Sequence, residues 1–458
     1  MQDFYHKHRA FVLLIVVGIV LEIAERSLDY FIGDNDGTLT HFFIGYLITF
    51  YQMTIIPIYL IILGLKHKLI TALALWITLI VGLIAVELFA RYFPIKDEIL
   101  GPHFQELLEK EKFSQKDQLI RDLSFIYGNK VKDIHKYYNY YLFSEAPKST
   151  DLIQYTDYYS ARDVPNSEPV ENANRIIWLF GGSTMQDIGT TDSLSIANQI
   201  AVYLNKANKP SAVINFGTVS FQSSLELIKM QNLLKNVSVE QYPDYVVFYG
   251  GYNDAANAYA WGAGSIHVSL SNPLAAVVER DFYKQFIYSV SGTLSKISVF
   301  WRHYLSSFIS RQIYFPVNVD DSQANLLKAI KMYEINIRSI EAICHEFQIV
   351  PIFILQPMLF TKKKLTSLEQ EILNEQNSVE YTEKLIKFMK EFYVKAGSAL
   401  EEHEGFYNLS DILNNNTANN FFDIGHTGPT TGPIIGEAIG KILVNNIVKS
   451  TVASTEAK

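Results

Sequence analysis

The chain has 458 residues, a formal net charge of -8 at pH 7, 28 tyrosines and 29 phenylalanines. This length allows two or three domains, or one large domain with appendages, and the aromatic content excludes an intrinsically disordered chain. The negative charge argues against nucleic acid as the main partner, because lysine and arginine contacts to phosphates dominate that kind of binding. The single cysteine, Cys344, excludes an intrachain disulfide.

Three apolar segments predict a membrane anchor over residues 1–93. Residues 42–65 and 69–86 contain no charged residue, and each is about as long as a bilayer-spanning helix, roughly 20 residues. The first segment is shorter and contains Glu22; it fits a third span, an uncleaved signal anchor or a signal peptide. No small-residue cleavage site follows it, which favours an uncleaved span. We therefore expect transmembrane helices over about residues 10–24, 42–65 and 69–90.

Basic residues in the short loops predict the orientation of this anchor. Lys66 and Lys68 lie between the second and third segments, and Lys7 and Arg9 precede the first. Because basic loops remain in the cytoplasm, we expect a cytoplasmic N-terminus and an extracytoplasmic chain after about residue 90. The lipid bilayer is then a partner of the anchor.

Residues 94–173 predict a juxtamembrane linker region. Residues 103–128 have helical periodicity, and an aromatic cluster occupies residues 137–143. Such a cluster fits an amphipathic element at the bilayer interface or packing against the next domain. We favour packing, because exposed aromatic patches are uncommon.

From residue 174 to about residue 450, short apolar strands alternate with amphipathic helices. This alternation predicts an α/β domain, a three-layer α/β/α sandwich around a parallel sheet. Ser223 and Glu226 have the spacing of a helix capping box. The expected strands are residues 175–180, 212–216, 244–250 and 350–357, and the expected helices include 193–207, 223–235 and 432–448.

The stretch between the third and fourth strands, about residues 258–347, exceeds an ordinary crossover. It predicts a helical insertion, which fits a lid over the site, a membrane-facing element or a plain addition to the domain. We favour a role in shaping the substrate pocket.

Ser183 comes directly after the first strand, in the run Gly-Gly-Ser-Thr. A phosphate-binding P-loop requires four residues between its glycines and a following lysine, and a dinucleotide-binding turn requires a third glycine. Neither pattern is present. A helix cap and a catalytic nucleophile remain as interpretations, and the local sequence does not separate them.

A nucleophilic serine requires a histidine base and an acid that orients the histidine. Asp423 precedes His426 by three residues in the run DIGH, a spacing that lets a carboxylate reach the imidazole on a loop. An oxyanion also requires hydrogen-bond donors. Gly217 follows the second strand, and Gly251 and Asn253 follow the third. In parallel sheets these strand ends share one edge, where ligands bind.

Four short blocks therefore follow one another along the chain: GGSTM with Ser183, NFGTVS with Gly217, GGYND with Gly251 and Asn253, and DIGH with Asp423 and His426. Their order and their positions after strands resemble the SGNH hydrolases, the superfamily that includes the GDSL esterases and lipases. The resemblance covers about residues 175–448 and leaves the apolar segments outside it.

The resemblance implies that Ser183 is the nucleophile, that His426 is the general base and later the acid, and that Asp423 orients the imidazole. It implies an oxyanion hole made of the N–H groups of Ser183 and Gly217 and the side chain of Asn253, with Gly182 and Gly251 supporting. The GDSL signature has an aspartate before the serine, whereas this chain has Gly182. That aspartate takes no part in the triad, so the difference weakens the inference about substrate and leaves the chemistry unchanged.

These patterns predict a membrane-anchored extracytoplasmic serine esterase that acts through an acyl-enzyme on an ester, such as an O-acylated envelope glycan or a lipid. The alternatives are an O-acyltransferase with the same triad and a non-catalytic scaffold subunit that binds a membrane protein partner. No cofactor is expected, and no metal site, because the histidines are scattered and Cys344 stands alone.

Overall fold

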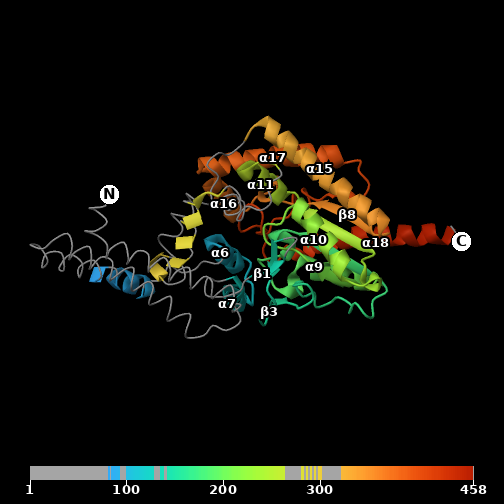
Figure 1. Ribbon diagram of the computed structural model, residues 1–458, viewed down its shortest axis with the longest axis horizontal. Coiled ribbons are helices and arrows are strands. Elements are labelled where there is room, and N and C mark those ends of the chain that lie inside the picture. The colour runs from blue at the N-terminus through green and yellow to red at the C-terminus, as the bar shows by residue number, and fades with distance from the viewer. Residues whose placement is uncertain are drawn as a thin grey trace, which may run out of the picture. The chain divides into compact units, whose positions relative to one another are not determined.

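The computed structural model describes residues 81–82, 84–92, 100–127, 135–138, 142–263 and 321–456, and short stretches between 280 and 301 (Figure 1). The spans expected over residues 10–24 and 42–65 lie outside the described residues, as does most of the span expected over 69–90. No helix within the described ranges has the length and apolar character needed to cross a membrane.

The chain divides into two compact units. The smaller consists of Met1–Ile95 and Ser295–Tyr304, and the larger of Lys96–Leu294 and Leu305–Lys458. In the smaller unit, the Glu87 carboxylate accepts hydrogen bonds from the Ser298 hydroxyl and the Val299 N–H, both at 2.9 Å. The larger unit contains the sheet and the candidate site.

A five-stranded parallel sheet forms the centre of the larger unit, in the order β6-β5-β7-β8-β9. Its strands are β5 (Ile176–Gly181), β6 (Ala212–Asn215), β7 (Tyr245–Gly250), β8 (Val350–Leu355) and β9 (Phe406–Asn408). The first four confirm the predicted parallel sheet, and β9 was not predicted. This is the 2-1-3-4-5 order of one class of doubly wound sheet, in which ligands bind where the strand order reverses, here between β5 and β7.

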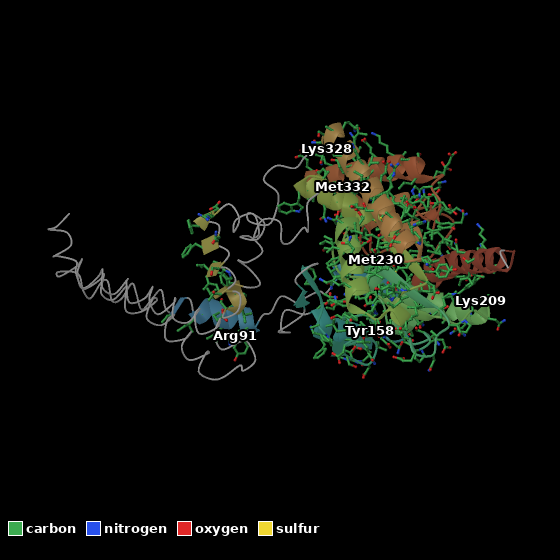
Figure 2. All side chains as sticks on the ribbon, turned by 45° about the vertical axis from the view of Figure 1, so that its right-hand side comes forward. Arg91, Tyr158, Lys209, Met230, Lys328 and Met332 are labelled. Carbon is green, nitrogen blue, oxygen red and sulfur yellow. The ribbon has the colours of Figure 1, made fainter. Side chains whose placement is uncertain are left out.

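Helices cover both faces of the sheet, as the three-layer prediction requires. Alternate side chains of β5 enter the two cores: Trp178 and Phe180 face one, and Ile177 and Leu179 face the other. Met230, labelled in Figure 2, is fully buried in the first core. The first core is covered by α10 (Ser223–Asn236), α11 (Tyr252–Trp261), α15 (Gln323–Glu346) and α17 (Glu380–Leu400), and the second by α9 (Ile196–Lys206) and α18 (Gly432–Glu456).

Within residues 258–347, the stretch expected to be an insertion, α15 is part of a covering layer. Its buried face includes Leu326, Tyr333 and Ile340, which pack in the first core. Figure 1 shows α11, α15 and α17 gathered on one side of the sheet. The crossover between β7 and β8 therefore ends in a helix that the sheet itself needs.

The residues before β5 also form packed structure. Here lie α6 (Pro102–Lys110), α7 (Lys116–Tyr127), β1 (His135–Tyr138), β2 (Leu142–Glu145), β3 (Lys148–Ser149) and β4 (Gln154–Tyr155). Phe104 of α6 contacts the Phe422 ring edge-on, with ring centroids 4.9 Å apart. Phe143, in the aromatic cluster, packs edge-on against Phe221 at 5.6 Å. The region expected to be a linker thus shares a core with the loop that carries His426.

The start of α10 differs from the prediction of a capping box. The N-cap is Gln222, whose side chain accepts the Ser224 N–H at 2.8 Å. The Ser223 hydroxyl donates instead to the Asp254 carboxylate. The prediction of a capping box at Ser223 and Glu226 is therefore wrong, because the Asp254 carboxylate of α11 takes the hydrogen bond of the Ser223 hydroxyl. The remaining short helices are α8 (Ser183–Gln186), η2 (Asp192–Leu194), η3 (Val239–Gln241), η5 (Leu359–Thr361) and α16 (Ser367–Asn377).

Candidate active site

Ser183 is the first residue of α8, directly after the turn that ends β5. Gly182 is the N-cap, and a Cβ at this position would lie 2.1 Å from the Asn253 amide nitrogen. That nitrogen is held in place because it donates to the Phe221 carbonyl at 2.7 Å. A side chain at position 182, including the aspartate of the GDSL signature, would displace Asn253. The glycine therefore lets Ser183 and Asn253 approach each other.

Ser183, His426 and Asp423 form a continuous chain of hydrogen bonds. The Ser183 Oγ lies 2.6 Å from His426 Nε2, and His426 Nδ1 lies 2.6 Å from Asp423 Oδ2. These distances are within the range over which a general base removes a proton from a nucleophile. Ser183 is only 5 % exposed. The structure thus brings the three residues together from segments 243 positions apart in the sequence.

Two aromatic rings hold the imidazole in place. The Phe422 ring is stacked on the His426 ring, with centroids 5.8 Å apart and planes at 14°. The Tyr252 ring meets the same imidazole edge-on at 6.4 Å. Both residues adjoin motif residues in the sequence, but neither carries a pattern that would have identified it as part of the site.

The pKa of His426 is raised above its ordinary value. Burial alone would lower it, but the Asp423 carboxylate outweighs burial by its charge and its hydrogen bond, and Asp187 adds to the effect. The pKa of Asp423 is lowered. Burial is the largest single influence and works against this shift, but the His426 charge and the hydrogen bonds from His426 and Gly425 together outweigh it. The carboxylate therefore stabilises the imidazolium that forms when His426 accepts a proton.

Two groups beside Ser183 are placed to stabilise an oxyanion. The Ser183 N–H belongs to the first turn of a helix, where N–H groups have no intrahelical acceptor. Asn253 uses one amide hydrogen on the Phe221 carbonyl, and its NH₂ group has a second. Gly251 begins α11 with a φ of 104°, and a Cβ there would lie 2.6 Å from the Leu355 side chain. This glycine turn positions Asn253.

Gly217 has a different environment from the one that the resemblance implies. Its N–H donates to the Asn215 side-chain oxygen at 2.9 Å. A Cβ at Gly217 would lie 2.4 Å from the Gln186 nitrogen, so the residue packs tightly against the backbone of α8. In this structure Gly217 supports the helix of the nucleophile, and its N–H is engaged by Asn215.

No group of three or more histidine, cysteine or acidic side chains among the described residues is placed to hold a metal ion. No family model matches the chain, and no curated protein matches it.

Similar solved structures include three esterases or lipolytic proteins. A lipolytic protein of the G-D-S-L family from Desulfitobacterium hafniense is 10% identical over 59% of this chain and 99% of its own, with a TM-score of 0.29. The acetylxylan esterase Axe2 from Geobacillus stearothermophilus is 12% identical over 58% and 93%, with a TM-score of 0.31. The acetyl xylan esterase AlAXEase is 12% identical over 58% and 98%, with a TM-score of 0.32. TM-scores this low carry no weight for function, which rests on the geometry of this chain.

Proposed function

We propose that this chain is a membrane-anchored, extracytoplasmic serine esterase that cleaves an ester through an acyl-enzyme at Ser183. The observation that carries the proposal is the chain of two 2.6 Å contacts from Ser183 through His426 to Asp423. A structural serine does not require a histidine whose second nitrogen faces a carboxylate.

In the first half of the reaction, His426 Nε2 takes the proton of Ser183 as the Oγ attacks the ester carbonyl. The Ser183 N–H and the free amide hydrogen of Asn253 then stabilise the oxyanion. His426 returns the proton to the departing alcohol, and the acyl group stays on Ser183. In the second half, His426 takes a proton from water as the water oxygen attacks the acyl carbonyl. The bond between the acyl carbon and Ser183 Oγ then breaks, the acid leaves, and His426 returns the proton to Ser183 Oγ.

The membrane location rests on the sequence. The charge-free segments 42–65 and 69–86 support an anchor, and the basic residues from Lys66 to Lys68 support an extracytoplasmic catalytic domain. That location makes an O-acylated envelope glycan the favoured substrate class and a lipid ester the second. The division of residues 1–93, 94–173 and 174–450 into anchor, connecting region and catalytic domain belongs to the same proposal.

Fluorophosphonate labelling of the detergent-purified full-length protein, with peptide mapping, tests the nucleophile. We expect labelling at Ser183 that is lost in Ser183→Ala and kept in Ser193→Ala, a matched change of an exposed serine on the following segment. A folded protein that takes up no label would contradict the esterase and favour the scaffold alternative.

The acyl acceptor requires its own measurement, because hydrolases and acyltransferases use the same triad. We expect p-nitrophenyl acetate to give free acetate at the same rate with and without an added glycan. Acetylated glycan at the expense of free acetate would instead identify an O-acyltransferase.

A further inference from the structure

Arg162 is a buried cation outside the groups that the proposed reaction uses, with 2 % of its surface exposed. Its backbone N–H donates to the Asn215 carbonyl at 3.0 Å, beside the end of β6. Its Nε donates to Asp192 at 2.7 Å, which forms an ion pair inside the protein. A buried charge of this kind is costly unless its hydrogen bonds are satisfied, so its other partners show what it holds.

The other partners of the guanidinium are carbonyls of the segment that begins at Ser183. One terminal nitrogen donates to the Gln186 and Asp187 carbonyls, both at 2.5 Å, and the other donates to the Thr190 carbonyl at 2.6 Å. We call residues 183–190 the nucleophile turn. Three of its carbonyls accept hydrogen bonds from the same guanidinium. A planar guanidinium can do this because its N–H groups point in several directions at once.

The nucleophile turn has a backbone shape that needs such support. Asp187 has a φ of 63°, in the left-handed region that is unfavourable for a residue with a side chain. The Ser183 carbonyl accepts the Asp187 N–H at 2.9 Å, which closes the single helical turn of α8. Asn215 adds a further hydrogen bond from its amide to the Met185 carbonyl at 2.9 Å.

The far side of the nucleophile turn contacts the loop that carries His426. A Cβ at Gly189 would lie 2.5 Å from the Phe422 ring and 2.6 Å from the Thr427 carbonyl. The Phe422 ring in turn stacks on the imidazole of His426. The conformation of the nucleophile turn therefore affects the position of Ser183, which lies in it, and the position of His426, whose ring packs on Phe422.

We propose that Arg162 is a positioning residue for this reaction, whose guanidinium holds the nucleophile turn so that Ser183 Oγ stays within hydrogen-bond reach of His426 Nε2. The proposal rests on the proposed function. Because a displacement of about 1 Å at a catalytic group can cost roughly a hundredfold in rate, loss of the guanidinium reduces acylation even where the fold survives. A lysine at position 162 would keep a positive charge next to Asp192, but its ammonium group cannot replace the planar guanidinium that binds several carbonyls.

The test measures the second-order rate constant for fluorophosphonate reaction in the full-length protein, with folding followed by near-ultraviolet circular dichroism. We expect a loss of about a hundredfold in Arg162→Ala and at least about tenfold in Arg162→Lys. Added guanidinium ion restores part of the rate in Arg162→Ala at unchanged circular dichroism, which a purely structural role would not produce. Two variants serve as controls. Arg121→Ala, at an exposed arginine of α7, controls for loss of a positive charge, and Leu443→Ala, at a buried leucine of α18, controls for loss of stability. We expect both to react at the wild-type rate.

The results separate this proposal from the proposed function. A wild-type protein that does not react overturns both. A reactive wild type, with both Arg162 variants folded and reacting at the wild-type rate, overturns the positioning role alone. If both variants unfold, Arg162 has a structural role and the positioning role is overturned. The same conclusion follows if Arg162→Ala is folded and slow but guanidinium does not restore its rate at any concentration that the wild type tolerates.

Discussion

Asp423 bonds to His426 twice, with different oxygens. Its Oδ1 accepts the backbone N–H of His426 at 2.7 Å, and its Oδ2 lies 2.6 Å from the imidazole Nδ1. The same Oδ1 also accepts the Gly425 N–H at 2.8 Å. One carboxylate thus shapes the turn and orients the ring on it. The position of the acid three residues before the base allows this double contact.

Replacement of Asp423 by asparagine removes the negative charge and keeps the size of the side chain. An amide facing Nδ1 favours the wrong tautomer of His426, so we expect kcat for ester hydrolysis to fall by about 10⁴-fold. Steady-state kinetics on p-nitrophenyl acetate measure it. The matched change Asp411→Asn, on an exposed residue of a nearby loop, should leave kcat unchanged. A loss below tenfold in Asp423→Asn would show that the carboxylate does not orient the base.

The raised pKa of His426 predicts the acidic limb of the rate profile. The base acts only when unprotonated, so kcat/KM should fall as the pH falls through a value above about 6.5, the ordinary histidine pKa. In Asp423→Asn the limb should move to lower pH, because the carboxylate that raises the pKa is gone. Rates of fluorophosphonate reaction between pH 5 and 9, values chosen to bracket about 6.5, measure both profiles. A limb that stays in place in the variant would exclude this carboxylate as the cause.

Asn253→Ala should affect the transition state more than the ground state. Loss of one oxyanion donor typically lowers kcat by about 10²–10³-fold, and we expect KM to change little. Asn236→Ala, an exposed asparagine at the end of α10, is the matched control. If KM rises while kcat is kept, Asn253 binds the substrate and does not stabilise the oxyanion.

Lys362 and Glu369 form a buried ion pair beside the loop that carries His426. The ammonium lies 2.7 Å from the carboxylate, and both side chains have no exposed surface. Glu369 also accepts the Asn420 N–H at 2.9 Å. Lys362→Met leaves this carboxylate buried without its cation, so we expect the free energy of unfolding to fall by about 3–5 kcal/mol.

Urea denaturation measures this change. Lys384→Met removes the cation of an exposed pair with Glu380 and should leave the free energy of unfolding nearly unchanged, because water and salt screen such a pair. Equal effects of the two substitutions would mean that the buried pair contributes no more than a surface pair.

The sheet and the residues of the candidate site could be predicted because their signals are local. Strands buried on both faces are continuous apolar runs, and DIGH contains its turn and its acid within four residues. Strand β9 has only three residues, too few for such a signal. Arg162 could not be predicted, because it binds backbone carbonyls, which every residue has. Gly217 stands at the expected position, but the sequence does not show that the Asn215 side chain would take its N–H.

The packing of α6 against Phe422 determines where a fragment of this protein should begin. A fragment trimmed back to the strands and loops that hold the candidate site would start near residue 174. Such a fragment would lose Phe104 and Leu107, and with them the cover of Phe421, Phe422 and Leu359. The face uncovered would include Phe422, whose ring stacks on the imidazole of His426. A fragment intended for crystallisation or for inhibitor screening should therefore begin before Pro102.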